Sequence, residues 1–484
     1  MEDKRSIQPA AAMEFRSRVE TLTQPIGQSA KTCFEKMMST KETIVRAVQP
    51  TPRGVAVGAP IRFFDDRTGY IRDQLENKDG TGRTFFRPKC VAIGPRFHGD
   101  KDLERGEEIK HIAAWDFWEC SDQPFSALYA QVEAVTGVTR ASYACSTASF
   151  SDEDFTAMMF VDGCFLLQLI VRHNIKDGGV LTDTDDLSSA LHQVGIATFL
   201  EDIFVVENQI PWLVLQALMA VRPVQVINFI DTRVAIWFDK QSARPDHQHG
   251  IGRSANDYGP IHLLDLLCKR QIGQASTLTD EQIYTYGKLE VVVALTSVTE
   301  LSEAGVNICP SRTPRFADVG FWWRWPVFGH LSLPPLILRQ RTMLLLLNML
   351  AFELFYWDKR DNRSNVAAYF GILSTLMSTE EDVRQLRRKG IIQTTLSDKE
   401  VMKFFKNLEP HTYWNNAIIT THLLRATINN FFKRQRVWID VHRFVYNNFK
   451  FLFAIESFLS VSLSILKAIL SLQGSSNAGP VAGH

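Results

Sequence analysis

The chain has 484 residues, 45% of them hydrophobic, so it can bury one large core or two to three average ones, and disorder as a whole is excluded. Lysine plus arginine and aspartate plus glutamate each number 53, and this zero net charge argues against binding of nucleic acid by the molecule as a whole. The cysteines are odd in number and widely spaced, which argues against a zinc knuckle or a disulfide framework and favours reduced thiols facing the cytosol. They are Cys33, Cys90, Cys120, Cys145, Cys164, Cys268 and Cys309.

Residues 1–60 differ in composition from the rest of the chain. They mix charged residues, alanine, threonine and proline with few large apolar residues, and they end in the linker-like stretch QPTPRGVAVGAP. The first fifteen residues, MEDKRSIQPAAAMEF, contain no apolar run of the kind found in secretory signals. We therefore predict a poorly ordered N-terminal arm over 1–60 and no cleaved signal.

From residue 61 to 450 the pattern is mostly helical. Apolar residues return every three or four positions in stretches such as DFTAMMFVDGCFLLQLI, HLLDLLCKR and RTMLLLLNMLAFELF. Strand signals are short: KCVAIG at 89–94, and HLSLPPLIL at 330–338, whose prolines would restrict it to a sheet edge. The expected fold is mainly α, one large multi-helix domain over 61–450 with a few short β-strands, because no linker separates the helical blocks.

Two polar clusters resemble metal sites, but the surrounding pattern favours loops. Asp183, Asp185 and Asp186 are expected to form a loop and an N-cap leading into a helix, because a calcium loop needs a longer ligand pattern. His247 and His249 lie in the insertion 239–260 without a third ligand nearby, so we interpret it as a solvated loop. No metal site is predicted.

Two carboxylates stand in apolar surroundings. Asp162 lies within MMFVDGCFLL and Glu207 within DIFVVENQIPWLVL. Buried acids with raised pKa values would suit a hydrolase-like enzyme, with Arg140 or His98 as helpers, if these groups converge on one cavity. They would equally suit a closed core in which an arginine such as Arg140, or helix N–H groups, neutralises each acid. GxGxxG, GxxxxGK[ST], HExxH and GxSxG are all missing, so the second interpretation is favoured and neither an enzyme nor a cofactor is predicted.

The stretch CVAIGPRFHGDKDLERGEEIK, residues 90–110, runs from an apolar segment through Gly94-Pro95 and His98-Gly99 into a charged helix. Glycines allow the chain either to approach a ligand or simply to turn, and a lone histidine without a nucleophile nearby favours the turn. Further on, Pro211 suits the first turn of a helix, with Asn208 or Gln209 as the cap before it.

Seven stretches, in this order, resemble the plant family called domain of unknown function 247: CVAIGPRFHGDKDLERGEEIK, DFTAMMFVDGCFLLQLI, DIFVVENQIPWLVLQAL, IHLLDLL, SVTELSEAGV, GHLSLPPLIL with NMLAFE, and STEEDVRQLRRKGII. The resemblance covers 61–472. The family pattern reads Ile-Gly-Pro-Tyr-His-His-Gly, followed by Leu, Met-Glu and Lys. This sequence keeps the following residues of that pattern: Ile93, Gly94, Pro95, His98, Gly99, Leu103, Glu107 and Lys110. Arg96 and Phe97 stand at the Tyr-His positions and Gly106 at the Met position. Asp162-Gly163-Cys164 and Glu207-Asn208-Gln209-Ile210-Pro211 stand as the family has them.

The resemblance implies a mostly helical plant protein without an enzymatic activity or cofactor to carry over, commonly ending in a single transmembrane helix. Some grass members of the family look like pollen self-incompatibility determinants. The matching residues, together with Arg140, are therefore expected to be structural.

The segment 451–472 is long enough to span a bilayer. Its apolar residues favour insertion, whereas two charges oppose it, so insertion energy alone does not decide. On a helical wheel the polar residues form one stripe, which would allow the helix to lie in the interface, pack into the protein's own core, or span with the stripe against another helix. The stripe contains Glu456, Ser457, Ser460, Ser464, Lys467 and Ser471.

The flanks of this segment predict an orientation. Residues 433–450 contain five Lys/Arg, whereas the short polar tail 473–484 contains none, so a spanning helix would leave the bulk of the protein in the cytosol. The family resemblance favours a C-terminal single-pass or membrane-associated helix over a purely cytoplasmic protein.

The leading hypothesis is therefore a non-enzymatic, membrane-associated plant protein that acts by protein recognition, in pollen self-incompatibility or related signalling. The loop 239–260, the arm, and 310–329 with its three tryptophans and three arginines are candidate recognition surfaces, the last being equally compatible with a loop folded onto the core. The alternative is a hydrolase-like enzyme using Asp162 and Glu207. No nucleic-acid partner is expected, because RQLRRKG at 384–390 suits a solvated helix face. The sequence identifies neither the protein partner nor the oligomeric state.

Overall fold

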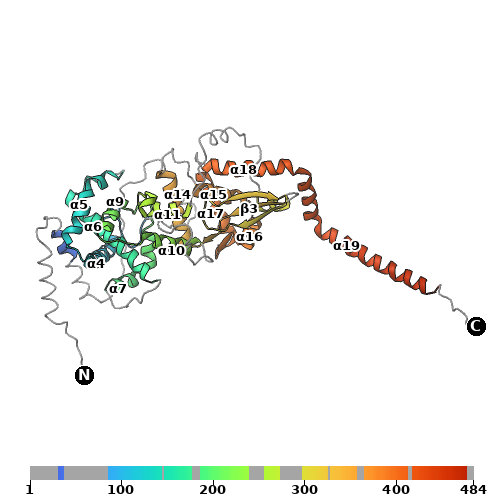
Figure 1. Cartoon of the computed structure of the whole chain (residues 1–484), viewed down its shortest axis with the longest axis horizontal. Helices are drawn as coiled ribbons and strands as arrows, with labels where there is room; N and C mark the ends of the chain where they lie inside the picture. The colour runs from blue at the N-terminus through green and yellow to red at the C-terminus, as the bar shows by residue number, and fades with distance from the viewer. Residues whose placement is uncertain are drawn as a thin grey trace, which may run out of the picture.

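The computed structural model describes residues 31–37, 85–143, 147–176, 186–238, 255–272, 297–324, 328–356, 365–412 and 417–476. Helices dominate this part of the chain, as predicted, and the few strands are short (Figure 1). The first group of elements is η1 (Lys101–Leu103), α4 (Glu104–Glu119), α5 (Phe125–Ala141), α6 (Asp152–Lys176), α7 (Asp186–Val194), α8 (Ile196–Asp202), α9 (Trp212–Val221) and α10 (Val226–Phe238).

The second group contains all the strands. It comprises η2 (Ala255–Tyr258), α11 (Leu263–Ile272), α13 (Val298–Glu303), β1 (Val306–Pro310), β2 (Gly320–Arg324), β3 (Phe328–Leu333), β4 (Leu336–Leu338), α14 (Gln340–Tyr356), α15 (Asn365–Leu376), α16 (Glu380–Arg388), β5 (Ile392–Thr394), α17 (Asp398–Thr412), α18 (Ala417–Arg434) and α19 (Arg436–Ser476). In Figure 1 the first group occupies one end of an elongated body, the sheet lies near the other end, and α19 projects beyond it.

Helix α6 is the centre of the first group. It packs against α4, α5, α9 and α10, and nearly all of residues 155–170 are buried, which explains why its sequence is apolar almost all round there. Its acidic first turn meets the free N–H groups of the helix start. Gly163 permits the close approach to α9, because a Cβ there would lie 2.7 Å from Leu218 Cδ1 and 3.0 Å from Val214 Cγ1.

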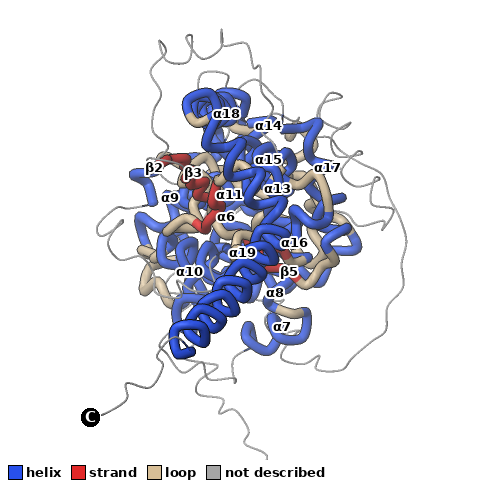
Figure 2. The backbone as a smooth tube through the Cα atoms, turned by 90° about the vertical axis from the view of Figure 1, so that its right-hand side faces the viewer, coloured by secondary structure: helices blue, strands red, loops and turns tan. Residues whose placement is uncertain are grey.

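The strands form two small sheets. In the first, β3 lies between β1, which runs parallel to it, and β2, which runs antiparallel; in the second, β4 pairs in parallel with β5. The prediction that 330–338 is an edge strand is wrong for β3, which is central, because Pro334 and Pro335 fall between β3 and β4 and remove no ladder hydrogen bond. Figure 2 shows the strands surrounded by helices on most sides.

The other predicted strand, 89–94, lies in irregular backbone that pairs with no described strand. Side chains replace a strand partner there. Gly106, at the family's Met position, allows this segment to cross α4 closely, because a Cβ would lie only 2.1 Å from the Cys90 carbonyl oxygen.

Part of the predicted N-terminal arm is ordered. Residues 31–37 are helical, and Phe34 packs 5.2 to 5.6 Å, between ring centroids, from Trp115, Trp118 and Phe125. For these residues the structure differs from the expectation of a poorly ordered arm, because Phe34 joins an aromatic cluster. The rest of 1–60 lies outside the described residues, as do most of 239–260 with its two histidines, Asp183 and Asp185, and the tail 477–484. Helix α7 begins at Asp186, where the acidic cluster predicted a helix start.

Candidate functional site

The motif segment 89–94 is held by the side chains of the α8–α9 connection. The Asp202 carboxylate accepts hydrogen bonds from the backbone N–H groups of Lys89 at 2.9 Å, Cys90 at 2.6 Å and Val91 at 3.1 Å. Burial raises the pKa of Asp202 to about 6, although these three N–H groups favour its charged form. Asp202 was not singled out from the sequence, because nothing in its local pattern distinguishes it from a surface acid at a helix end.

Asn208 completes this support. Its side-chain oxygen accepts from Ile93 N at 2.7 Å, and its amide nitrogen donates to the carbonyl oxygens of Val91 and Asp202, both at 3.0 Å. Asn208 therefore supplies the donor and acceptor that a neighbouring strand would supply, which is why this short apolar segment forms no sheet here.

Gln209 ties the same connection to α11. Its amide nitrogen donates to the carbonyls of Ile203 and Val205 at 2.8 and 2.9 Å, and its oxygen accepts from Leu264 N at 3.2 Å. The prediction that Asn208 or Gln209 caps the following helix is wrong, since Pro211 is itself the N-cap of α9 and no side chain caps it. Both amides are used by the connection instead.

Asp162 is fully buried and paired with a lysine. Lys110 Nζ lies 2.5 Å from Asp162 Oδ1, 2.8 Å from Glu107 Oε1 and 2.8 Å from the Ala92 carbonyl oxygen, while Gly94 N donates to Asp162 Oδ2 at 2.7 Å. Burial alone would lower the pKa of Lys110, but the carboxylates of Asp162 and Glu107 outweigh it and raise the pKa. The ammonium group thus donates to Asp162 and to the Ala92 carbonyl oxygen and forms an ion pair with Glu107.

Glu207 is paired separately, with Arg96. Arg96 Nη2 lies 3.6 Å from Glu207 Oε1, and the two side chains are only 5% and 2% exposed. Arg96 is one of the departures from the family pattern, so this chain places a cation where the resemblance would place tyrosine. The two buried acids therefore have two different cationic partners, contributed by α4 and by the turn.

Arg140 serves neither acid. Its guanidinium donates to the carbonyl oxygens of Thr147 at 2.8 Å and Ser151 at 3.0 Å, forms an ion pair with the exposed Asp152 at 2.9 Å, and lies over the Phe155 ring. The suggestion that Arg140 neutralises a buried carboxylate is thus wrong. It fastens the chain entering α6 to the end of α5.

The glycines and His98 form a turn. Gly94 and Gly99 have φ of 74° and 79°, which suits glycine, and a Cβ on Gly94 would lie 2.7 Å from the Gln209 carbonyl oxygen. His98 is exposed and meets the Phe150 ring edge-on at 5.7 Å. Pro95 is buried within the same turn.

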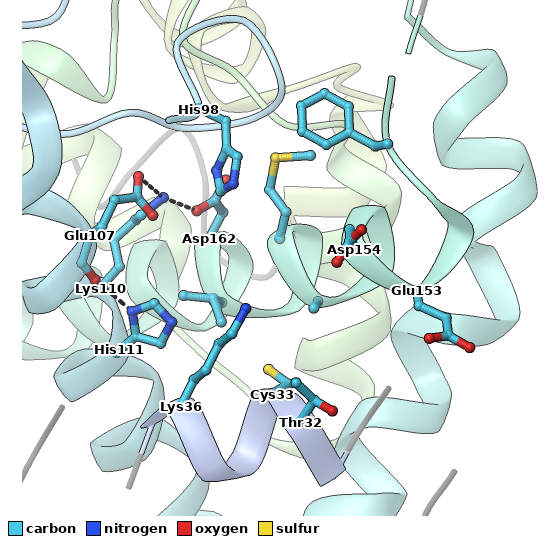
Figure 3. A pocket seen from close by; sticks show the side chains of 14 residues that line it. Thr32, Cys33, Lys36, His98, Glu107, Lys110, His111, Glu153, Asp154 and Asp162 are labelled. Atoms are coloured by element: carbon cyan, nitrogen blue, oxygen red, sulfur yellow. Dashed lines mark hydrogen bonds and ion pairs between the residues drawn. The ribbon is translucent and has the colours of Figure 1, made fainter. Parts of the chain in front are cut away.

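A cavity of about 510 Å³ opens beside the Lys110–Asp162 pair (Figure 3). Figure 3 shows His98 above it, α4 on one side, α6 behind it and the helical segment 31–37 below. The titratable groups that line it are Cys33, Lys36, His98, Glu107, Lys110, His111, Glu153, Asp154 and Asp162. Asp162 and His98 therefore converge on one cavity, whereas Glu207 and Arg140 are not among the lining residues.

One histidine of this cavity is held in its neutral form. His111 Nδ1 lies 2.7 Å from the Glu107 carbonyl oxygen and so carries the proton, and burial lowers the pKa of the ring, which keeps it neutral. Asp162 is held by an ammonium group and an amide. The described residues contain no cluster of three His, Cys, Asp or Glu that would hold a metal ion.

Five of the described thiols are shifted away from the reactive thiolate form. Burial raises the pKa of five described cysteines, which keeps them protonated and poorly nucleophilic: Cys33, Cys90, Cys164, Cys268 and Cys309. The cysteines of the described chain are unpaired, as the spacing indicated.

The C-terminal helix presents a different surface. Two described helices are long and apolar enough to cross a membrane: Asp152–Asn174, which is the buried core of α6, and Phe453–Leu470 of α19, of which nothing is buried. The possibility that this segment packs into the protein's own core is therefore wrong. The hydroxyls of Ser457 and Ser464 donate to the carbonyls four residues earlier, at 2.8 and 2.9 Å. These two residues of the stripe are thus satisfied within the helix.

The tryptophan-rich stretch is divided between core and surface. Phe321 and Trp323 on β2 lie 5.6 and 6.3 Å, between ring centroids, from Phe431 of α18. Trp322 points the other way, is 50% exposed and stacks on His330, and Phe328 at the start of β3 is 53% exposed. Successive side chains of a strand point to opposite faces, so β2 places Phe321 and Trp323 against the core and leaves Trp322 on the surface. The stretch is therefore partly folded onto the core and partly exposed.

Comparison with known proteins identifies the family of this chain. Residues 73–463 match DUF247, a family described as plant protein of unknown function. The chain belongs to this family. A UPF0481 protein of Arabidopsis thaliana is 25% identical to it over 368 residues, which cover 72% of each chain. No solved structure matches.

The match puts the features of this DUF247 protein in context. It includes the motif turn, the two buried ion pairs and the cavity-lining residues other than Thr32, Cys33 and Lys36, and it extends past residue 450 into the exposed apolar part of α19. Of the cations in the two buried ion pairs, Lys110 is indicated by the sequence only as a position that matches the family motif. The signal that could have assigned it is its place among buried apolar residues of α4, where a lysine requires a buried acid.

Proposed function

We propose that this DUF247 protein is a non-enzymatic, membrane-anchored recognition protein whose bulk lies in the cytosol. The observation that carries the anchor is the exposure of Phe453–Leu470, which has a mean hydropathy of 1.8 and no buried part. A helix of this composition in water exposes many large side chains, and each gains about 1.5–3 kcal/mol on leaving water. A bilayer provides that environment for the whole length of the segment.

The charges of the segment are compatible with spanning. Glu456 and Lys467 each lie three residues inside the ends of Phe453–Leu470, about 4.5 Å along the helix axis, so both can extend to the interfaces. Together with the internally bonded serines, this supports a span that needs no partner for its polar stripe. Five Lys/Arg before the segment and none after it support a cytosolic body.

The motif residues support a structural rather than a catalytic role. Asp162 and Glu207, the pair that a hydrolase-like enzyme would need, are separately neutralised by Lys110 and Arg96, and only Asp162 lines the cavity. A general acid or base needs a poised proton and access to substrate, and Glu207, at 3% exposure, lines no part of this cavity. The hydrolase-like alternative is therefore less well supported.

Protein recognition is supported by exposed aromatic surface at the sheet. Trp322 and Phe328 are large, rigid apolar side chains of the type that anchors interfaces. The resemblance to grass self-incompatibility determinants leads us to propose recognition in pollen or in related signalling. Pollen from plants that lack this chain should then be accepted by stigmas that previously rejected it, and unchanged rejection would exclude that role.

The anchor is tested by alkaline carbonate extraction of the tagged full chain. The full chain should stay in the membrane pellet, and a chain ending at Lys450 should be soluble. A full-length variant with Leu459→Lys and Leu463→Lys should also be released, because two charges at the centre of the span cost about 2.5–3.5 kcal/mol each. The matched variant with Leu459→Ile and Leu463→Ile should stay in the pellet. Extraction of the unchanged chain would refute the anchor.

A further inference from the structure

The part of α19 that precedes the apolar segment exposes its own apolar row. Val437, Val441 and Phe444 are 74%, 48% and 60% exposed. The opposite face holds the helix to the body: Ile439 is 4% exposed, and His442 Nδ1 lies 2.8 Å from the last carbonyl oxygen of α13. One face of this segment is thus used by the body while another is left in water.

The row continues along the helix with the spacing of a coiled-coil seam. After Phe444 it passes through Asn448, Phe451, Ile455 and Phe458, and the three apolar residues are 66%, 40% and 73% exposed. The steps alternate between four and three residues, which is the a/d repeat of two helices that wind around each other. The row therefore starts well before the part of α19 that a bilayer would cover.

The geometry of the body leaves this row accessible. At about 100° per residue, Ile439 lies about 200° from Val437 and 160° from Val441 around the helix axis. The side of α19 that packs against the body is thus opposite the row. The row is therefore left available to a second helix.

The sequence of the row points to a second copy of this chain as the occupant. In a parallel pair every residue of the row meets itself, so Val441 and Ile455 supply the β-branched a positions that favour two strands. Asn448 is a polar a position that pairs with its own copy and fixes the register. The basic Arg436 and Arg443 are seven residues apart and fall on an outer position, so two copies bring no like charges together at the seam.

We propose that this protein forms a parallel homodimer through α19, along the row that begins at Val437, Val441 and Phe444. The part of the seam beyond Phe453 rests on the proposed membrane anchor, which also sets the parallel orientation of two copies. The part before it stands on the exposure and spacing of its own residues.

The test is cross-linking of the full chain in native membranes. Val437→Cys and, separately, Phe444→Cys should give a dimer with a short bis-maleimide, because seam residues of paired helices lie within 8–10 Å. Arg443→Cys is the matched control on the outer face and should give no more dimer than the unchanged chain, which reports the native thiols. Two differently tagged copies should be joined in the same product. An equal yield at Arg443→Cys, or a product that contains a foreign protein, would overturn the homodimer.

A second variant separates this proposal from the anchor. Val441→Lys, added to the Val437→Cys chain, should lower the dimer yield at least about tenfold, because an unpaired charge in the seam costs more than the 1.4 kcal/mol that tenfold represents. Carbonate extraction of the same samples reports the anchor independently. A pelleted chain without seam cross-links refutes the dimer and leaves the anchor standing, and a soluble chain that cross-links at the seam does the reverse.

Discussion

Replacing Lys110 by methionine would test whether the buried ion pair is the support of the motif turn. Lys110 and Asp162 are 1% and 0% exposed, so the substitution leaves a buried carboxylate without its cationic partner. Removing one partner of a buried pair costs about 3–5 kcal/mol, and the Ala92 carbonyl loses its donor for about 1 kcal/mol more. We expect Lys110→Met to lower the free energy of unfolding by about 4–6 kcal/mol, a large part of the usual 5–15 kcal/mol.

Asp162→Asn is the second single variant of a double-mutant cycle with Lys110→Met. Asparagine can still accept the hydrogen bond from Gly94 N, and in Lys110→Met with Asp162→Asn no charge remains buried. The double variant should therefore lose at least about 2 kcal/mol less than the sum of the two single variants. Arg388→Met is the control, because its pair with Glu381 is 66% and 43% exposed and should contribute about 0–1 kcal/mol.

The assay is urea unfolding of the detergent-solubilised full chain followed by tryptophan fluorescence. Trp115 and Trp118 lie on the same helix as Lys110 and report on its surroundings. A loss for Lys110→Met no larger than that for Arg388→Met would refute the reasoning, as would additive single and double variants. In either case the turn would be held by Asp202 and Asn208 alone.

Two further predictions concern packing and pH. Gly163→Ala should lower the free energy of unfolding by about 1–3 kcal/mol, because its Cβ would lie 2.7 Å from Leu218 Cδ1; Gly137→Ala, with nothing within 4 Å, should be neutral or stabilising in the same urea titration. Burial lowers the pKa of His262 from 6.5 to about 3, so the folded state binds fewer protons than the unfolded state between these values. Stability from this ring is complete above about pH 6.5 and falls by about 5 kcal/mol as the pH drops to about 3. Asp202, whose pKa is raised, acts with the opposite sign, so the measured quantity is the difference between the wild type and His262→Asn, and a difference independent of pH would contradict the assignment.

Periodicity was sufficient for the helices, because an apolar stripe of period three to four has few other structural solutions. It failed for 89–94, a short apolar run that predicts a strand, because Asn208 and Asp202 replace the neighbouring strand. It also failed for the prolines near β3, which end one strand and precede the next. In both cases the deciding hydrogen bonds come from residues distant in sequence, or from a boundary that periodicity does not locate.

The sequence indicated the two buried acids but neither their partners nor Asp202. The apolar context of Asp162 and Glu207 indicated buried acids, and burial is what the structure shows. Charge alone suggests Arg140 as a partner of a buried acid, whereas the fold places Lys110 beside Asp162 and Arg96 beside Glu207. Pairing depends on where α4 crosses α6, and the period of either helix contains no information about that crossing.

Helix α19 is a single element of 41 residues, about 61 Å long, that starts against the sheet end of the body and continues through the apolar segment without a break. A hinge would let the body swing freely above whatever holds the other end. Without one, a tilt or rotation of its far half is transmitted to α13 and α18, against which the start of α19 packs. With Phe453–Leu470 in a bilayer, Trp322 and Phe328 would be presented at a narrow range of heights, so only partners of matching reach could meet them.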